Sequence, residues 1–187
     1  DLGENSMGYG IEINEEIKSI MNYLNEKKFY ILTKRLVELE KEIAMCITID
    51  IPGAIIYGRS RAGMTKAITY LKNTFGTSYG ADIPIITWDI TDHTVTEKQF
   101  YSSFINAIGL PDPKIRETAL VLKTRIVNTL VVIGGETKYR TIILLVDEAS
   151  ELDERDFVWL MDLYNSLAHH NITLITFMFG TIELKAL

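Results

Sequence analysis

Four short runs of apolar residues constrain the fold of this chain more than any other feature of its sequence. They are Ala54 to Tyr57, Ile83 to Trp88, Thr141 to Val146 and Ile172 to Phe179, and each is apolar on both faces. A strand of this kind belongs to a parallel sheet that is covered by helices on both sides. The intervening segments are long enough to be helical crossovers, so the sequence predicts an α/β fold with a three-layer αβα parallel sheet.

Helical periodicity fills the segments before and between these runs. Thr96 and Gln99 predict a capping box that opens a helix through Ile108. The longest predicted helix is expected to end at Gly134 and Gly135. The spacing of apolar residues places the other helices at Ile13 to Leu24, Phe29 to Ile43, Lys66 to Phe75, about Lys114 to Ile133, and Phe157 to Leu167.

The chain is predicted to be one domain preceded by a short arm. Its 187 residues are 47% hydrophobic and 24% charged, which is ordinary for a chain with one sizeable core. Residues 1–12 have a linker-like composition of Gly, Asn and Ser and are expected to be a flexible arm or an expression remnant. Residues 13–187 are then one folded core, with a helical extension over 13–50 and the αβα layers over 51–187.

The charge balance limits what the chain can offer to nucleic acid. Its 19 Lys and Arg residues against 25 Asp and Glu leave a formal charge of −6, so the surface as a whole should repel DNA. Any contact with DNA must be local. The best candidate is a basic run comprising Lys114, Arg116, Lys123, Arg125, Lys138 and Arg140. A run of this kind is more often a solvated helix face.

The sequence is expected to contain neither a membrane span nor a secretion signal. No stretch approaches the roughly 18 uninterrupted apolar residues that a membrane span needs. The stretch from Asp1 to Glu16 is acidic where a secretion signal is basic and then apolar. A cytoplasmic location is therefore expected.

The segment after the first apolar run has the layout of a phosphate-binding loop. Its glycines match the spacing of G-x-x-x-x-G-K-[ST], and a buried strand precedes it and an amphipathic helix follows. Gly58 and Gly63 would let the backbone bend so that consecutive amides face phosphates, while Thr65 would hold Mg²⁺. The expected nucleotide contacts are Gly58, Arg59, Ser60, Arg61, Ala62, Gly63, Met64, Thr65 and Lys66. The alternative is a glycine-rich turn between a strand and a helix.

A second motif ends the third apolar run with two carboxylates. Asp147 and Glu148 follow Val146 directly. Alone this would be an ordinary strand end, but combined with the loop it becomes specific for an NTPase. Asp147 would hold Mg²⁺ through its water shell, and Glu148 would orient or deprotonate the attacking water. No guanine-reading motif of the Asn-Lys-x-Asp kind is present, which favours ATP by default.

Met64 departs from the phosphate-loop pattern, which has lysine at this position. The lysine places a positive charge on the β- and γ-phosphates, and a thioether supplies neither charge nor a hydrogen-bond donor. Lys66 cannot replace it, because side chains two positions apart on a helix face different ways. We hypothesise that hydrolysis is severely weakened while binding through backbone amides and Mg²⁺ survives.

Three motifs together resemble the transposition regulator ATPases of the TniB/TnsC type, which are AAA+ P-loop NTPases. The motifs are Ile51 to Gly58, Leu144 to Glu148, and Phe179 to Leu184, and the similarity covers roughly residues 29–187. The third follows that family's Gly-Thr-x-Glu-Leu pattern and is the most discriminating. The resemblance implies ATP-bound homo-oligomers or filaments on double-stranded DNA. Such proteins pass target-site information to a transposase from target-selector proteins and are released on hydrolysis.

The resemblance also suggests a γ-phosphate sensor. Thr181 follows the last predicted strand, where ATPases of this class place such a polar residue, and Thr176 is the competing choice. An arginine finger cannot be chosen from one sequence because it usually reaches a neighbour's site. Its candidates are Arg140, Arg155 and Arg125. The small helical lid that follows the sensor region in this family is expected to be absent or truncated.

Two other functions stay open. A replication-initiator-like or helicase-loader ATPase would share the fold but prefer a specific origin or a helicase partner. A nucleotide-gated scaffold would bind nucleotide without turnover and would carry Met64 naturally. The presence of Glu148 argues against the scaffold, because a protein that never hydrolyses nucleotide does not need a water-activating carboxylate.

Overall fold

The computed structural model describes residues 33–49, 51–59, 62–79, 83–91, 96–182 and 184. They belong to one compact unit, Thr33–Leu187. Its elements in chain order are α2 (Lys34–Thr48), β1 (Gly53–Gly58), α3 (Met64–Tyr79), β2 (Ile85–Asp89), α4 (Glu97–Ala107), α5 (Ala119–Gly135), β3 (Thr141–Asp147), the 3-10 helix η1 (Ala149–Glu151), α6 (Glu154–Ala168) and β4 (Thr173–Thr181). The predicted arm 1–12 and the helix expected from Ile13 to Leu24 lie outside the described residues.

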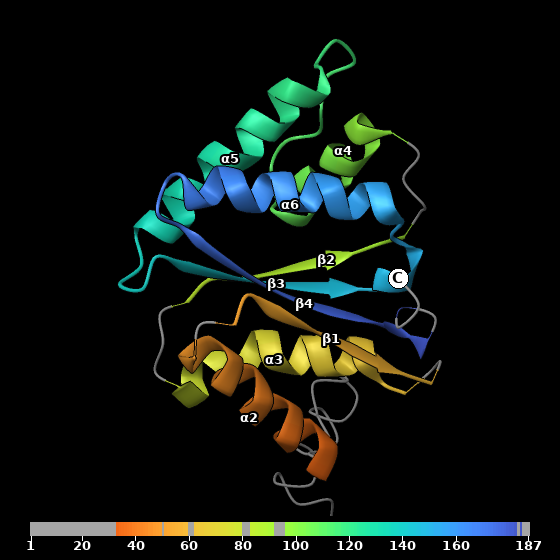
Figure 1. Cartoon of the computed structure of the whole chain (residues 1–187), viewed down its shortest axis with the longest axis vertical. Coiled ribbons are helices and arrows are strands. Elements are labelled where there is room, and N and C mark those ends of the chain that lie inside the picture. Colours follow the sequence, from red (N-terminus) through yellow and green to blue (C-terminus); the bar gives the residue numbers. More distant parts are fainter. Residues whose placement is uncertain are drawn as a thin grey trace, which may run out of the picture. The chain divides into compact units, whose positions relative to one another are not determined.

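The strands form one parallel sheet in the order β1-β4-β3-β2 (Figure 1). All three neighbouring pairs are parallel. The last of the described strands, β4, therefore lies between β1 and β3. The predicted parallel α/β sheet is confirmed.

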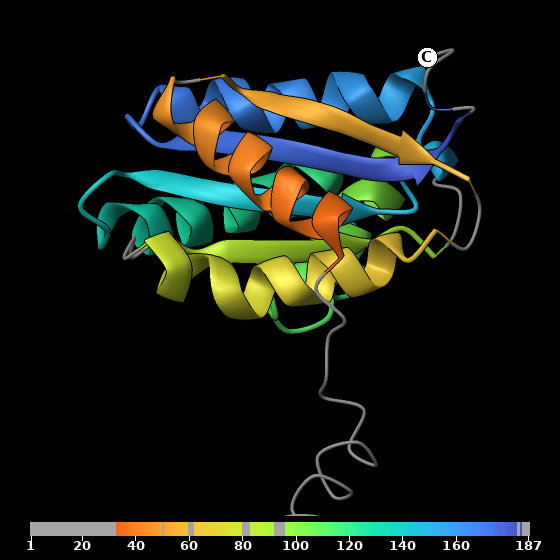
Figure 2. The ribbon, with the colours of Figure 1, turned by 90° about the horizontal axis from the view of Figure 1, so that it is seen from below.

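Helices cover both faces of this sheet. Figure 2 shows α2 and α3 on one face and the remaining helices behind the other. On the first face α3 packs against β2 and β3, and α2 packs against α3, where the Tyr70 hydroxyl donates a hydrogen bond to Glu40 Oε2 at 3.1 Å. On the second face α4, α5 and α6 pack against each other and against β2, β3 and β4. This arrangement is the predicted three-layer αβα fold.

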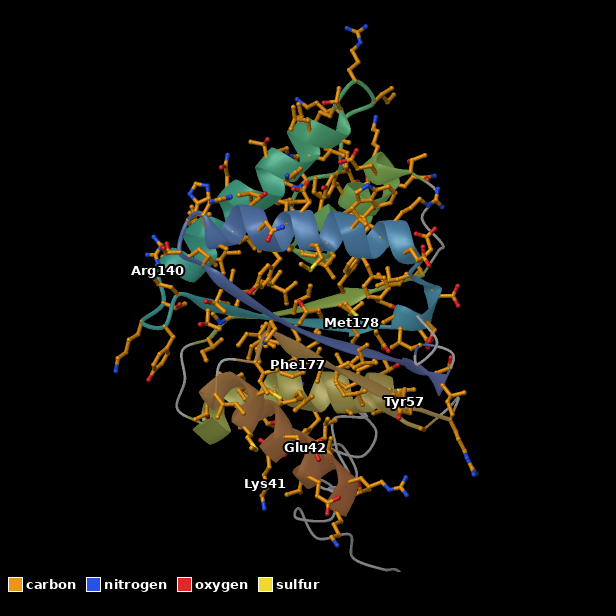
Figure 3. All side chains as sticks on the ribbon, viewed as in Figure 1. Lys41, Glu42, Tyr57, Arg140, Phe177 and Met178 are labelled. Atoms are coloured by element: carbon orange, nitrogen blue, oxygen red, sulfur yellow. The ribbon has the colours of Figure 1, made fainter. Side chains whose placement is uncertain are left out.

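The core is centred on the two inner strands, β3 and β4. Every residue of β3 is buried. Along β4 successive side chains alternate between the layers, with Phe177 and Met178 on opposite sides of the sheet (Figure 3). Met178 joins the cluster that faces α4, α5 and α6, and Trp88 packs edge-on against Phe100 and Phe104 in the same cluster, with ring centroids 5.2 and 5.0 Å apart.

The first strand differs from the expectation that it is apolar and covered on both faces. Ile55 and Tyr57 are 49% and 47% exposed. The reason is the position of β1 at the edge of the sheet, because α6 packs against the neighbouring strand β4. No helix in the described ranges is long and apolar enough to cross a membrane.

The predicted limits of α5 are wrong at both ends. The helix begins at Ala119 rather than near Lys114, because the Thr118 hydroxyl accepts the Val121 N–H at 3.4 Å and caps it there. Ile115, which fitted the helical spacing, is 96% exposed. At the other end the helix includes Gly134 and Gly135.

Two helix N-termini carry capping boxes. Thr96 and Gln99 form the predicted box at α4. At α6 Asp153 accepts the N–H groups of Arg155 and Asp156 at 2.8 and 3.1 Å, and the Asp156 carboxylate accepts the N–H of Asp153 at 2.9 Å. The acidic turn that precedes α6 therefore caps this helix.

The charge of Asp153 should stabilise the protein in a pH-dependent way. The hydrogen bonds from the Arg155 guanidinium hold the pKa of Asp153 below its usual range in the folded protein. A lowered native pKa gives stability that is present above the unfolded pKa, about 3.9, and is lost as pH falls through the native value. Asp153→Asn keeps the capping oxygen but removes the charge, so we expect it to lower the thermal midpoint at pH 7.

This difference should shrink below about pH 4, where aspartate in the unfolded chain is protonated. Thermal unfolding of both proteins at pH 7 and pH 3 measures it. Asp112→Asn is the control, because Asp112 is an exposed carboxylate in the loop before α5. An equal loss of midpoint at both pH values would mean that the charge of Asp153 contributes nothing.

Candidate nucleotide site

The carboxyl ends of the four strands lie along one border of the sheet, the carboxyl edge. The predicted site residues lie at this edge. Gly58, the last residue of β1, pairs with Thr181 at the end of β4. Asp147, at the end of β3, pairs with Asp89 at the end of β2. Parallel α/β sheets bind ligands outside the carboxyl ends of their strands.

The predicted phosphate loop leaves β1 at this edge and enters α3. Within it the Ala62 N–H donates to the Arg59 carbonyl at 3.1 Å, and the Gly63 carbonyl accepts the N–H of Ala67 at 3.0 Å as the helix begins. Gly63 has a φ of +87°, a conformation that favours glycine. Ser60 and Arg61 lie outside the described residues.

The two glycines of the loop do not have the same role. Gly58 has no left-handed φ, and a Cβ there would meet Ala62 Cβ at an ordinary 3.7 Å. The expected need for a bend is therefore seen at Gly63 and not at Gly58.

The three residues after Gly63 form the first turn of α3. Met64 is half-buried, whereas Thr65 and Lys66 are exposed. The first N–H groups of a helix lack partners within the helix and carry its positive end, so they attract anions. The first turn of α3 thus supplies amides and a hydroxyl, but its Met64 side chain has no charge for a phosphate.

The two carboxylates after β3 have different surroundings. Asp147 is 8% exposed, and its Oδ1 accepts the Glu148 N–H at 3.0 Å. Glu148 is exposed and has a φ of +52° and a ψ of 36°, which is left-handed and uncommon for a residue with a side chain. Backbone strain of this kind costs roughly 1–3 kcal/mol and concentrates at functional sites. The turn exposes the Glu148 carboxylate at the edge of the sheet.

Thr181 is hydrogen-bonded to Ser150 in the segment after Glu148. Its N–H donates to Ser150 Oγ at 2.7 Å, and the two hydroxyl oxygens are 3.1 Å apart. Thr176, the competing sensor candidate, pairs with Gly53 at the start of β1, away from this edge. Sequence reasoning missed Ser150, because no periodicity or spacing links it to a residue 31 positions later.

The oxygen ligands at this edge suit Mg²⁺. Thr65 offers a hydroxyl and Asp147 a carboxylate, and Mg²⁺ prefers oxygen ligands and keeps several of its waters. No group of three or more His, Cys, Asp or Glu residues in the described part of the chain could hold a metal by itself. A Mg²⁺ ion held by Thr65 and Asp147 would complete its coordination with waters and nucleotide phosphates.

The basic run expected to contact DNA does not form one cluster. Two of its residues, Lys114 and Arg116, precede α5, whereas Lys138 and Arg140 follow it. The 17 residues of α5 separate these two pairs by about 25 Å. Lys123 pairs with Asp162, and Arg125 pairs with Glu117. Two carbonyls, those of Asn171 and His170, accept hydrogen bonds from Arg140, which lies at the end of the sheet opposite Tyr57 (Figure 3). The exposed cations at the amino end of α5 are Lys114 and Arg116.

Of the arginine-finger candidates, all three have partners within the chain. Arg140 bonds to two carbonyls and Arg125 to Glu117, and Arg155 pairs with Asp153. Their assignment stays a prediction, because a finger acts on a neighbouring molecule.

Comparisons with known proteins agree with this architecture. Residues 53–187 match the family described as the AAA domain. The crystal structure of Cdc6p from Pyrobaculum aerophilum is similar, with a TM-score of 0.58 and 12% identity over 82% of this chain and 41% of that one. At this identity the likeness shows the fold alone. No curated protein matches the chain. Since the matched region takes in all four strands and most of the sequence, the chain belongs to the AAA domain family and has the fold of an AAA+ P-loop NTPase.

Proposed function

We propose that this protein is an ATP-binding AAA+ regulator of DNA transposition, in which Met64 weakens hydrolysis. In this proposal ATP drives assembly on DNA, and the assembly communicates the choice of target to a transposase. The observation that carries the ATPase part is the meeting of Gly58, Thr181 and Asp147 at one edge of the sheet.

Each residue at this edge has a chemical task in the proposal. The α3 amides bind the phosphates, and Thr65 and Asp147 hold Mg²⁺, which when bound neutralises charge on the phosphate oxygens. Glu148 accepts a hydrogen bond from the attacking water and orients it. Thr181 donates its hydroxyl hydrogen to the γ-phosphate.

The transposition part is proposed from the Gly-Thr-x-Glu-Leu motif, whose glycine and leucine are both described by the structure. Leu184 is 1% exposed, and a Cβ on Gly180 would lie 3.1 Å from its Cδ2. The glycine and the leucine of the motif are therefore neighbours in space. The transposition role itself rests on the resemblance that this motif carries.

DNA-dependent assembly tests this proposal. We expect the Met64→Lys, Glu148→Gln double variant, which should bind ATP without hydrolysing it, to assemble on a duplex of arbitrary sequence with Mg²⁺-ATP and not with ADP. Sedimentation and gel mobility at several salt concentrations measure the assembly. Affinity should fall steeply with salt, as it does when cations neutralise phosphates.

The structure supplies a matched pair of variants for this experiment. Replacing Lys114 and Arg116 by alanine should reduce the salt dependence, by about one unit of slope for each DNA phosphate that these side chains no longer neutralise. Lys138→Ala, at the far end of α5, should leave the slope unchanged. Failure of the trapped protein to assemble on any duplex would rule out the transposition role.

A replication-initiator or helicase-loader ATPase is the second candidate, because it shares the fold and the same site. It predicts assembly on a particular origin sequence or with a helicase, and weak assembly on arbitrary duplex. The same measurement therefore separates the two candidates.

A further inference from the structure

Ser150 joins two segments of the proposed site, the 3-10 helix after β3 and the end of β4. It lies in η1, two residues after Glu148, and its hydroxyl contacts Thr181 from β4. The binding and hydrolysis steps assigned to the other residues of the site do not use it. A role for Ser150 in nucleotide recognition rests on the proposed ATPase function of this site.

The hydrogen bonds of Ser150 determine what Thr181 can do. Ser150 Oγ accepts the Thr181 N–H at 2.7 Å, and the two hydroxyls lie 3.1 Å apart with either able to donate. A hydroxyl has one hydrogen and two acceptor positions. If Ser150 donates to Thr181 Oγ1, the hydrogen of Thr181 is not used by Ser150 and can be donated to a phosphate oxygen. If Thr181 donates to Ser150, its hydrogen is used within the protein.

A γ-phosphate bound at the carboxyl ends of the strands would favour the arrangement in which Ser150 donates its hydrogen to Thr181. The anion accepts a hydrogen from Thr181, and Thr181 in turn accepts one from Ser150. Hydrogen bonds in such a chain polarise and strengthen one another. Without the Ser150 hydroxyl, the Thr181 side chain loses a hydrogen-bond partner that helps to fix its orientation.

Gly180 provides independent support for this contact. A Cβ at Gly180 would lie 2.4 Å from Ser150 Oγ and 3.1 Å from the Ser150 backbone nitrogen. Glycine is therefore the residue that allows Ser150 to approach the end of β4. The close approach is a feature of both segments and does not depend on one flexible side chain.

We propose that Ser150 is a positioning residue that aligns the Thr181 hydroxyl with the γ-phosphate and couples it to the Glu148 turn. Through this contact, β4 and the segment after β3 respond together to the presence of the third phosphate. The readout of the coupling is discrimination between ATP and ADP.

A double-mutant cycle tests the proposal. In the Met64→Lys protein, Ser150→Ala should weaken ATP binding and turnover by about tenfold, the size of one lost hydrogen bond, and leave ADP binding unchanged. Thr181→Val should have a similar effect. Adding Ser150→Ala to Thr181→Val should change the ratio of ATP to ADP affinity no further, because the two residues act as one unit.

Calorimetry with ADP and with a non-hydrolysable ATP analogue gives the ratio, and phosphate release gives turnover. A merely structural Ser150 would weaken both nucleotides equally or add its effect to that of Thr181→Val, and either result overturns the proposal. If Ser150→Ala does not fold, Ser150→Cys keeps the volume but is a weak donor and serves in its place. A Met64→Lys protein that binds no nucleotide refutes the proposed function itself, and with it this inference.

Discussion

Replacing Met64 with lysine is expected to raise ATP turnover by about 10²–10³-fold, the effect of one preorganised donor at a developing charge. Met64 is the first residue of α3 and its side chain is half-buried at the proposed site. Its thioether gives the phosphates no charge and no hydrogen-bond donor. Phosphate release with and without duplex DNA measures turnover, and calorimetry with Mg²⁺-ATP measures binding.

Two controls make this result specific. Met64→Leu changes the side chain without adding a charge and should leave turnover at its original level. Lys66→Met in the Met64→Lys protein should have little effect, because Lys66 faces another direction on the helix. If Met64→Lys gives no gain in turnover, our account of Met64 is wrong.

The second large effect is expected at Gly53, where alanine should destabilise the protein by about 4 kcal/mol or more. Gly53 has a φ of +154°, and a Cβ there would lie 1.9 Å from the Thr176 carbonyl oxygen. That oxygen belongs to the backbone of β4, and the Thr176 N–H is held by the Pro52 carbonyl at 2.9 Å. Neither strand can move aside without breaking the pairing of β1 with β4.

Urea unfolding measures the change, and Gly135→Ala is its matched control. Gly135 is exposed at the end of α5, and a Cβ there would meet nothing within 4 Å. We expect this control to leave stability unchanged or to raise it by up to about 1 kcal/mol, since alanine favours a helix. Equal stability of Gly53→Ala and the parent protein would show that the strand pairing at β1 is not as described.

Much of the fold could be predicted because its signals are local. The run Thr141 to Val146 differs from β3 by one residue, and the Thr96 capping box is present as expected. The turn at Gly63 follows from glycine spacing and is seen in its positive φ. Each of these features depends on residues within a few positions of one another.

Two of the features that could not be predicted depend on which strands become neighbours. The exposure of Ile55 follows from the edge position of β1, which no local pattern records. The contact of Ser150 with Thr181 joins segments that only the sheet brings together. The start of α5 could not be located because the cap at Thr118 competes with an apolar spacing that continues before it.

The place of β4 in the sheet has a consequence for the newly made chain on the ribosome. Among the described residues β1 pairs with β4 alone, and β4 ends at Thr181. About 120 residues after Gly58 must be synthesised before its partner exists, which takes roughly 6–25 s at ordinary elongation rates. During that interval the emerging phosphate loop has no sheet behind it. We therefore expect nascent chains halted before residue 173 to have no nucleotide affinity, and the site to form when the final strand leaves the exit tunnel.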